Sequence, residues 1–179
     1  MRRFIHLLSL MAAGLVPTLC HGQVLEEYQV KAGYLLNIAK FTDWPGEANV
    51  AASEPFTVCV IGLDPFGHWL DDTTAVESPK GRRLQVRRIA DARESIGCQV
   101  VFVSSSERKR VGQILGGLEG HHVLTIGDCD AAVAAGVIVN FTREDMRIRF
   151  EINTDSAEKQ GLHISPRLLS LARIVKSSR

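Results

Sequence analysis

Two short, strongly apolar runs limit the fold of this chain more than any other feature. Residues 56–62 read FTVCVIG and residues 98–104 read CQVVFVS. Runs that are apolar at nearly every position are typical of β-strands covered on both faces. Behind the second run, Val111, Ile114 and Leu115 recur at helical spacing. Because parallel strands need crossover connections, this strand–helix order predicts a mostly parallel sheet with helices on both faces.

The remaining predicted elements complete a single three-layer α/β domain. Apolar residues along 26–41 share one helical face, Lys31 and Lys40 fall off this stripe, and Pro45 closes the segment. A polar turn joins the last two strands, which predicts an antiparallel pair late in the chain. Further helices are expected at 66–70, 91–95, 107–118, 128–135 and 166–175, and further strands at 84–86 (an edge strand), 122–127, 136–141 and 146–152.

The N-terminus has the features of a secretory signal peptide. Residues 1–22 begin with MRR, continue as an apolar stretch to Cys20, and end at the small residue Gly22. The stretch is too short and too broken by Gly and Pro for a transmembrane helix. Lipid attachment at Cys20 is the alternative, but Leu19 stands where such a site needs a small residue. The prediction is a cleaved signal peptide and a mature domain over 23–179.

Charge and composition narrow the range of partners. Loss of the two N-terminal arginines leaves 19 Lys and Arg against 20 Asp and Glu. Binding to nucleic acid depends on a surplus of positive charge, so no nucleic-acid partner is expected. A basic segment at 80–88 is typical of a solvated sheet edge that discourages strand pairing. Contact with lipid headgroups or an acidic partner is the alternative.

The sequence lacks a catalytic or metal-binding constellation. The loop GLDPFG at 62–67 has neither of the glycine spacings that wrap phosphates. The serines at 104–106 are expected to cap a helix, with anion binding as the alternative. His121 and His122 are adjacent and have no third ligand at a useful spacing. We therefore expect a protein that is not an enzyme and that uses no cofactor and no metal.

Three cysteines follow the signal peptide: Cys59, Cys98 and Cys129. Cysteines of exported proteins tend to pair, because their compartment is oxidising. Cys59 and Cys98 both lie in strand-like runs and could be neighbours in one sheet, where a bridge would contribute about 4 kcal/mol. Cys129 is then a buried free thiol, or it forms an intermolecular bridge.

Several segments together resemble the YfiR family of periplasmic proteins. They are EEYQVKAGYLLNIAKFTDWP, FTVCVIGLDPFG, GCQVVFVSSSER, VLTIGD, GVIVNF, RIRFEIN and GLHISPRLLSLARIV. They cover nearly all of the chain after the signal peptide, in order. The resemblance implies a periplasmic, often homodimeric protein that represses an inner-membrane diguanylate cyclase by binding its periplasmic sensor region. Such a repressor modulates cyclic-di-GMP signalling and biofilm formation.

The resemblance also implies control by a second partner and by disulfides. In that system an OmpA-like outer-membrane lipoprotein sequesters the repressor, and disulfides hold the repressor in its working form. Cys59 and Cys98 match one family bridge, whereas Cys129 alone could represent the other, so the second bridge is expected to be absent. The alternative function is a stand-alone periplasmic small-molecule sensor, because such domains also resemble input modules of membrane histidine kinases.

A contact surface is expected near the C-terminus. Glu151 ends an alternating strand, and the predicted last helix brings Arg173 into its neighbourhood. A carboxylate beside an arginine forms a structural ion pair, or it lines a pocket or a partner site. The residues expected to contact a partner or ligand are Glu151, Ile152, Pro166, Leu169 and Arg173. For Ile152 and Leu169, packing of the last helix on the sheet is the competing role.

Overall fold

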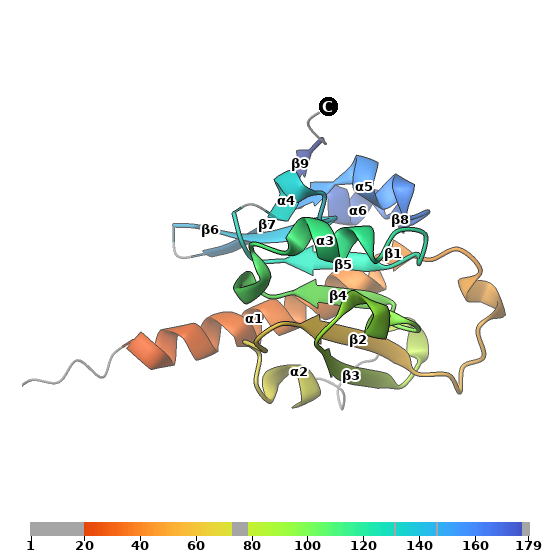
Figure 1. Ribbon diagram of the computed structural model, residues 1–179, viewed down its shortest axis with the longest axis horizontal. Coiled ribbons are helices and arrows are strands. Elements are labelled where there is room, and N and C mark those ends of the chain that lie inside the picture. The colour runs from red at the N-terminus through yellow and green to blue at the C-terminus, as the bar shows by residue number, and fades with distance from the viewer. Residues whose placement is uncertain (1–19, 73–78, 131, 146, 177–179) are drawn as a thin grey trace, which may run out of the picture.

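The computed structural model describes residues 20–72, 79–130, 132–145 and 147–176, and its centre is a seven-stranded sheet (Figure 1). The strand order is β3-β2-β4-β5-β6-β7-β9. Strands β3, β2, β4, β5 and β6 are parallel, β7 is antiparallel to β6, and β9 is parallel to β7. This confirms the mostly parallel sheet and its late antiparallel pair. The bounds are β2 Phe56–Ile61, β3 Leu84–Ile89, β4 Val100–Val103, β5 Leu124–Gly127, β6 Val139–Glu144, β7 Arg147–Asn153 and β9 Arg173–Val175.

Helices lie on both faces of the sheet, as predicted. The long helix α1 (Cys20–Lys40) crosses one face, and its N-terminal end extends past the sheet in Figure 1. On the other face lie α3 (Val111–Gly116), α4 (Ala132–Ala135) and the short 3-10 turn η4 (Ala92–Ser95). Helix α2 (Trp69–Asp72) follows β2, and α5 (Thr154–Lys159) follows β7. The three-layer α/β architecture is therefore confirmed.

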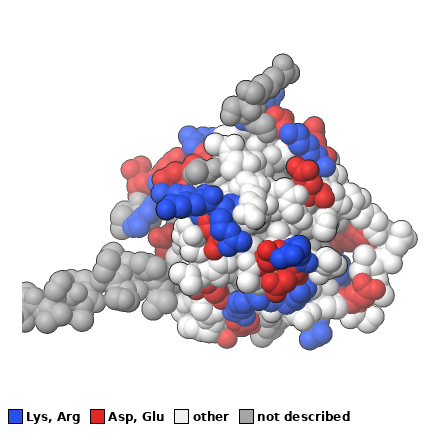
Figure 2. Space-filling view, in the orientation of Figure 1, with Lys and Arg blue, Asp and Glu red and all other residues white. Residues whose placement is uncertain are grey.

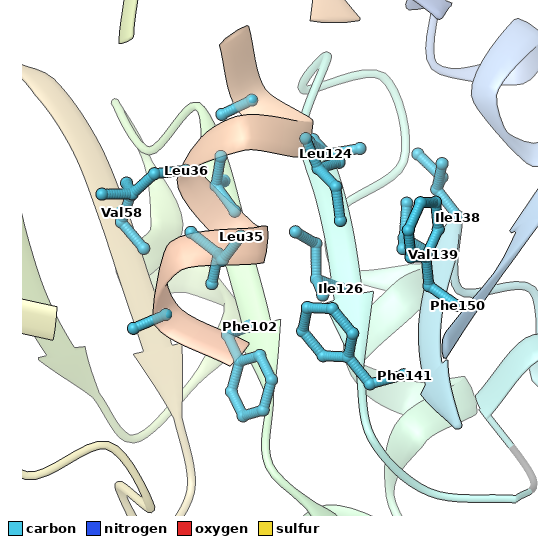
Figure 3. Packing of buried hydrophobic residues seen from close by; sticks show 14 of the residues in the cluster. Leu35, Leu36, Val58, Phe102, Leu124, Ile126, Ile138, Val139, Phe141 and Phe150 are labelled. Atoms are coloured by element: carbon cyan, nitrogen blue, oxygen red, sulfur yellow. The ribbon is translucent and has the colours of Figure 1, made fainter. Parts of the chain in front are cut away.

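The core on the α1 side joins the helix to six strands of the large sheet, β2 to β7. Figure 3 shows Leu35 and Leu36 of α1 directed at Val58, Phe102 and the neighbouring strands. Leu35, Val58 and Phe102 are fully buried. Complete burial of a side chain of this size stabilises the fold by about 1.5–3 kcal/mol. This packing fixes α1 against the sheet along its C-terminal half.

The opposite face of β2 and β4 is also buried, which explains why both strands are apolar at nearly every position. Along β2, Val58 and Val60 face α1, whereas Cys59 and Ile61 belong to a second buried cluster under η4, α3 and α4. Side chains of a strand point alternately to the two faces, so a strand covered on both sides needs apolar residues at every position.

The largest difference from the sequence-based expectation lies at the C-terminal end. The predicted helix over 166–175 is wrong in its second half, because α6 ends early (Pro166–Leu169) and the chain then forms β9. In β9, Arg173, Ile174 and Val175 pair with β7. Ile174 and Val175 are β-branched and have only a weak preference for helix. Hydrogen bonding to the free edge of β7 therefore decides the conformation of this segment.

Smaller differences concern the ends of elements. The predicted helix over 107–118 is divided into the 3-10 turn η5 (Ser105–Glu107) and the shorter α3. Helices α2 and α4 begin later than expected, and α1 begins earlier. A second, two-stranded sheet joins β1 (Thr42–Asp43) to β8 (His163–Ile164). Two residues per strand are too few to produce a periodic signal in the sequence.

Most of the predicted signal peptide, residues 1–19, lies outside the described residues. Helix α1 spans the predicted cleavage point after Gly22, so that boundary stays a prediction. Among the described helices, none combines the length and the apolar character needed to cross a bilayer.

Candidate interaction surface

Glu151 and Arg173, the two charged residues of the predicted contact surface, form an ion pair. They are direct partners in the register of β7 and β9. The Glu151 side chain is 10% exposed and that of Arg173 is 67% exposed, so the pair leads from the interior to the surface. The structure thus brings these residues together, but by pairing two strands and not by packing a helix.

The other predicted contact residues lie at different depths. Ile152 is fully buried in the core on the α1 side, so it supports the surface from beneath and does not reach a partner. Leu169 is half-buried against the same core. Pro166 is exposed at the first position of α6, where its missing N–H and fixed φ suit a helix start. Pro166 and Arg173 are therefore the accessible members of the set.

Strand β9 ends the seven-stranded sheet, and its outer edge pairs with no other strand that the structure describes. Leu171 just before it is 68% exposed, and Ile174 within it is 44% exposed. An open strand edge flanked by exposed apolar side chains is a template for pairing with another chain. We call Pro166, Leu171, Arg173 and Ile174 the β9 edge surface. The sequence did not indicate Leu171 and Ile174, because a helix was expected there.

The opposite edge of the sheet is held by arginines of the basic segment. Arg88 contacts Asp71 at 2.5 Å and Asp64 at 2.9 Å. The hydrogen bond from Arg88 holds the pKa of the Asp71 carboxyl below its usual range. Arg82 is buried and donates hydrogen bonds to two backbone carbonyls. Elsewhere, positive and negative side chains lie next to one another on the face that Figure 2 shows. The basic segment thus anchors the β3 edge.

Cys59 and Cys98 are joined by a disulfide, as predicted. Cys59 lies in β2, and Cys98 lies just before the adjacent strand β4, with their Cα atoms 5.9 Å apart. Both are buried, at 0% and 4% exposure. Cys129 is a buried free cysteine, in agreement with the first of the two expectations for it.

A buried cluster of charged side chains ties α1 to the end of β5. Lys31 Nζ lies 2.6 Å from Glu27 and 3.4 Å from Asp128. The Tyr28 hydroxyl donates a hydrogen bond to Asp128, and Arg143 of β6 lies 3.5 Å from Glu27. The side chains of Lys31 and Asp128 are 6% and 1% exposed. Lys31, predicted to lie off the apolar stripe of this helix, is buried, at 5% exposure of the whole residue. Its i,i+4 spacing from Glu27 is the signal in the sequence for an ion pair.

Tyr28 makes this cluster sensitive to high pH. Burial, followed by the hydrogen bond to Asp128, raises the pKa of Tyr28 far above its usual range. In the unfolded chain this tyrosine ionises near pH 10, whereas in the folded chain it keeps its proton. The contribution of Tyr28 to the free energy of unfolding is therefore fully present below about pH 10, and the stability of the protein falls as the pH rises above that value. We expect Tyr28→Phe to reduce this alkaline loss, measured by urea unfolding between about pH 9 and pH 11. Tyr34→Phe is the control, and an identical decline in all three proteins would contradict the prediction.

The usual ligand site of an open parallel sheet is filled by the protein's own side chains. Such sites lie at the carboxyl ends of strands where the strand order reverses, here between β2 and β4. The Leu63 amide donates to Ser106 Oγ at 3.0 Å, and a Cβ on Gly62 would lie 2.5 Å from that oxygen. Ser104 caps η5 by accepting from the Ser106 amide. The predicted serine cap therefore belongs to this 3-10 turn and not to α3, whose N-cap, Arg110, makes no side-chain cap hydrogen bond.

The two adjacent histidines do not assemble a metal site. His122 Nδ1 lies 2.7 Å from the backbone oxygen of Gln160. Within the described ranges, no group of three or more His, Cys, Asp or Glu side chains is placed to hold a metal ion.

Together, the fold and this surface define a three-layer α/β protein that presents an open sheet edge for contact. A family model described as YfiR/HmsC-like matches residues 28–173. The chain belongs to the YfiR/HmsC-like family, a family of periplasmic regulatory proteins.

Two solved structures share the fold. One is a conserved domain protein from Vibrio cholerae, with a TM-score of 0.57, 11% identity, and coverage of 84% of this chain and 60% of that chain. The other is an ABC domain in complex with L-Trp from Streptococcus pneumonia, with a TM-score of 0.55, 10% identity, and coverage of 80% and 60%. This chain therefore spans about 60% of the length of each. At this identity the likeness concerns the fold alone.

Proposed function

We propose that this chain is a periplasmic, non-enzymatic regulator that binds and represses the periplasmic sensor region of an inner-membrane diguanylate cyclase. Membership of the YfiR/HmsC-like family supports this role in general. The observation that carries the proposal is the open edge of β9, with the exposed Leu171 and Ile174 beside the Glu151–Arg173 pair. A repressor of this kind shifts the cyclase equilibrium by binding the inactive conformation more tightly than the active one.

The same surface suits relief of repression by competition. In this proposal an OmpA-like outer-membrane lipoprotein sequesters the regulator and so frees the cyclase. Pairing of two β9 edges would also give a homodimer, because an edge strand can accept an identical strand. The regulator acts in the periplasm after cleavage of its signal peptide, and it modulates cyclic-di-GMP signalling and biofilm formation.

Intracellular cyclic-di-GMP in a deletion strain tests the proposal. Its level is expected to rise on deletion and to return when the wild-type gene is restored. Complementation with Leu171→Glu is expected to fail, because it places a charge in the apolar part of the β9 edge surface, two residues before the strand, and so opposes contact with a partner strand. Leu171 is 68% exposed, so this change leaves folding intact.

Leu63→Glu is the matched control, since Leu63 is also an exposed leucine (77%) but follows β2, which β4, β5, β6 and β7 separate from β9 in the sheet. It is expected to complement like the wild type. An unchanged cyclic-di-GMP level on deletion would contradict the cyclase proposal. Equal complementation by both variants would contradict the assignment of the β9 edge.

A second candidate function, a stand-alone small-molecule sensor, is favoured by one feature. A pocket between α3, α4 and α5 is large enough for a small molecule. A rise in melting temperature on ligand addition, with no cyclase recovered on the purified protein, would favour this function over the first.

A further inference from the structure

The pocket of about 500 Å³ lies on the side of the sheet opposite α1 and apart from the β9 edge surface. Its volume falls in the range of small-molecule sites. The lining residues come from the end of α3 and the loop after it, from β5, from the end of α4 and the segment between α4 and β6, and from α5 and the residue after it. Gly136 lies in the wall of the pocket with a φ of +105°, a backbone conformation that L side chains rarely adopt.

The inner part of the pocket presents neutral polar groups. Gln160 Nε2 donates to the Leu118 carbonyl at 3.2 Å, which leaves Gln160 Oε1 as an acceptor. That oxygen is buried and has no hydrogen-bond partner. Thr125 Oγ1 accepts from the Ile138 amide at 3.0 Å, so its own proton remains available for donation. Because buried acceptors are nearly always paired, Gln160 Oε1 indicates a ligand that supplies an N–H or O–H donor.

The rim of the pocket carries opposite charges. Glu119 and Lys159 are exposed lining residues. A charged ligand group inside the pocket would need a buried counter-charge, and the interior residues Thr125, Ser156 and Gln160 carry none. Charged ligand ends therefore belong at the rim, and a neutral donor belongs inside. Leu115 and Ile138 supply apolar wall for an aliphatic side chain.

We infer that this pocket binds a short zwitterionic peptide of about two residues. Its peptide N–H donates to Gln160 Oε1, its ammonium faces Glu119, and its carboxylate faces Lys159. A free amino acid has no N–H between its charged ends, so it cannot satisfy the interior and the rim at once. The assignment rests on the second candidate function, the small-molecule sensor, for which it names the ligand class. It is independent of the regulator function, because the β9 edge surface takes no part in it.

Calorimetric titration of the purified protein with L-alanyl-L-leucine tests the inference. Saturable binding is expected. Ala135→Leu, which narrows the pocket, is expected to weaken that binding about tenfold or more. Ala134→Leu is the matched control, because Ala134 is the preceding residue of α4, is exposed, and does not line the pocket. Absence of saturable binding, or an equal affinity of the two variants, would overturn the assignment.

Two further probes test the ligand class. L-leucine lacks the peptide N–H, and N-acetyl-L-alanyl-L-leucine amide lacks both charged ends. Each is expected to bind at least about tenfold more weakly than the dipeptide. Equal binding of L-leucine would refute the role of Gln160 Oε1, and equal binding of the blocked peptide would refute the role of the rim. Leu171→Glu is expected to bind the dipeptide normally, which separates this test from that of the regulator function.

Discussion

Replacing Cys59 by serine should lower the free energy of unfolding by about 4 kcal/mol, because the disulfide closes a loop whose ends are 39 residues apart. The effect comes mainly from the unfolded chain, which gains conformational freedom when the bridge is absent. For a chain of this length, we expect a fall in melting temperature of about 10 °C. Urea and thermal unfolding under non-reducing conditions measure it.

Reductant supplies the control for this variant. The wild type treated with dithiothreitol should unfold like Cys59→Ser, and the variant itself should not respond to the reductant. Cys129→Ala should keep the response, since Cys129 is not bridged. In the deletion strain, Cys59→Ser is expected to complement poorly. A variant as stable as the oxidised wild type would contradict the stabilising role of the bridge.

Replacing Lys31 by methionine is expected to destabilise the fold by about 3 kcal/mol. The change leaves the Asp128 carboxylate, whose side chain is 1% exposed, with the Tyr28 hydroxyl but without its cation. Removing one partner of a buried ion pair is costly because the remaining charge stays desolvated. Urea unfolding near neutral pH measures the effect.

A second substitution separates lost charge pairing from lost packing. Asp128→Asn, added to Lys31→Met, removes the stranded charge but keeps an acceptor for Tyr28, so the double variant should recover much of the lost stability. Lys109→Met, at an exposed position, should leave stability nearly unchanged. If the double variant is less stable than Lys31→Met, the interpretation of the cluster as a charge pair is wrong.

The sequence predicted the central sheet well because burial on both faces leaves an unambiguous pattern. The runs that contain β2 and β4 are apolar at nearly every position, and their cysteines are bridged. The ion pair between Glu151 and Arg173 also connects residues that the sequence singled out. In each case, a local pattern sufficed to identify the residues involved.

Features that depend on distant partners were missed. Residues 173–175 form a strand because they pair with the free edge of β7. Their own composition does not indicate that such an edge is available. Lys31 is buried because Asp128, far away in the sequence, meets it at the end of β5. The exposed Leu171 and Ile174 can be identified as part of an interaction surface only when the strand order is known, because that order places them at the edge of the sheet.

The strand order also bears on how the protein assembles as it is made or exported. After β4, each new strand of the large sheet (β5, β6, β7 and β9) pairs with the strand of that sheet that precedes it in the chain. A chain that emerges N-terminus first can therefore extend its sheet in one direction, with each new strand meeting an edge that already exists. Both disulfide partners emerge before β5, so the bridge can form early and stabilise the first part of the sheet, made of β2, β3 and β4. Strand β1 can pair only late in synthesis or export, because its partner β8 lies close to the C-terminal end of the chain.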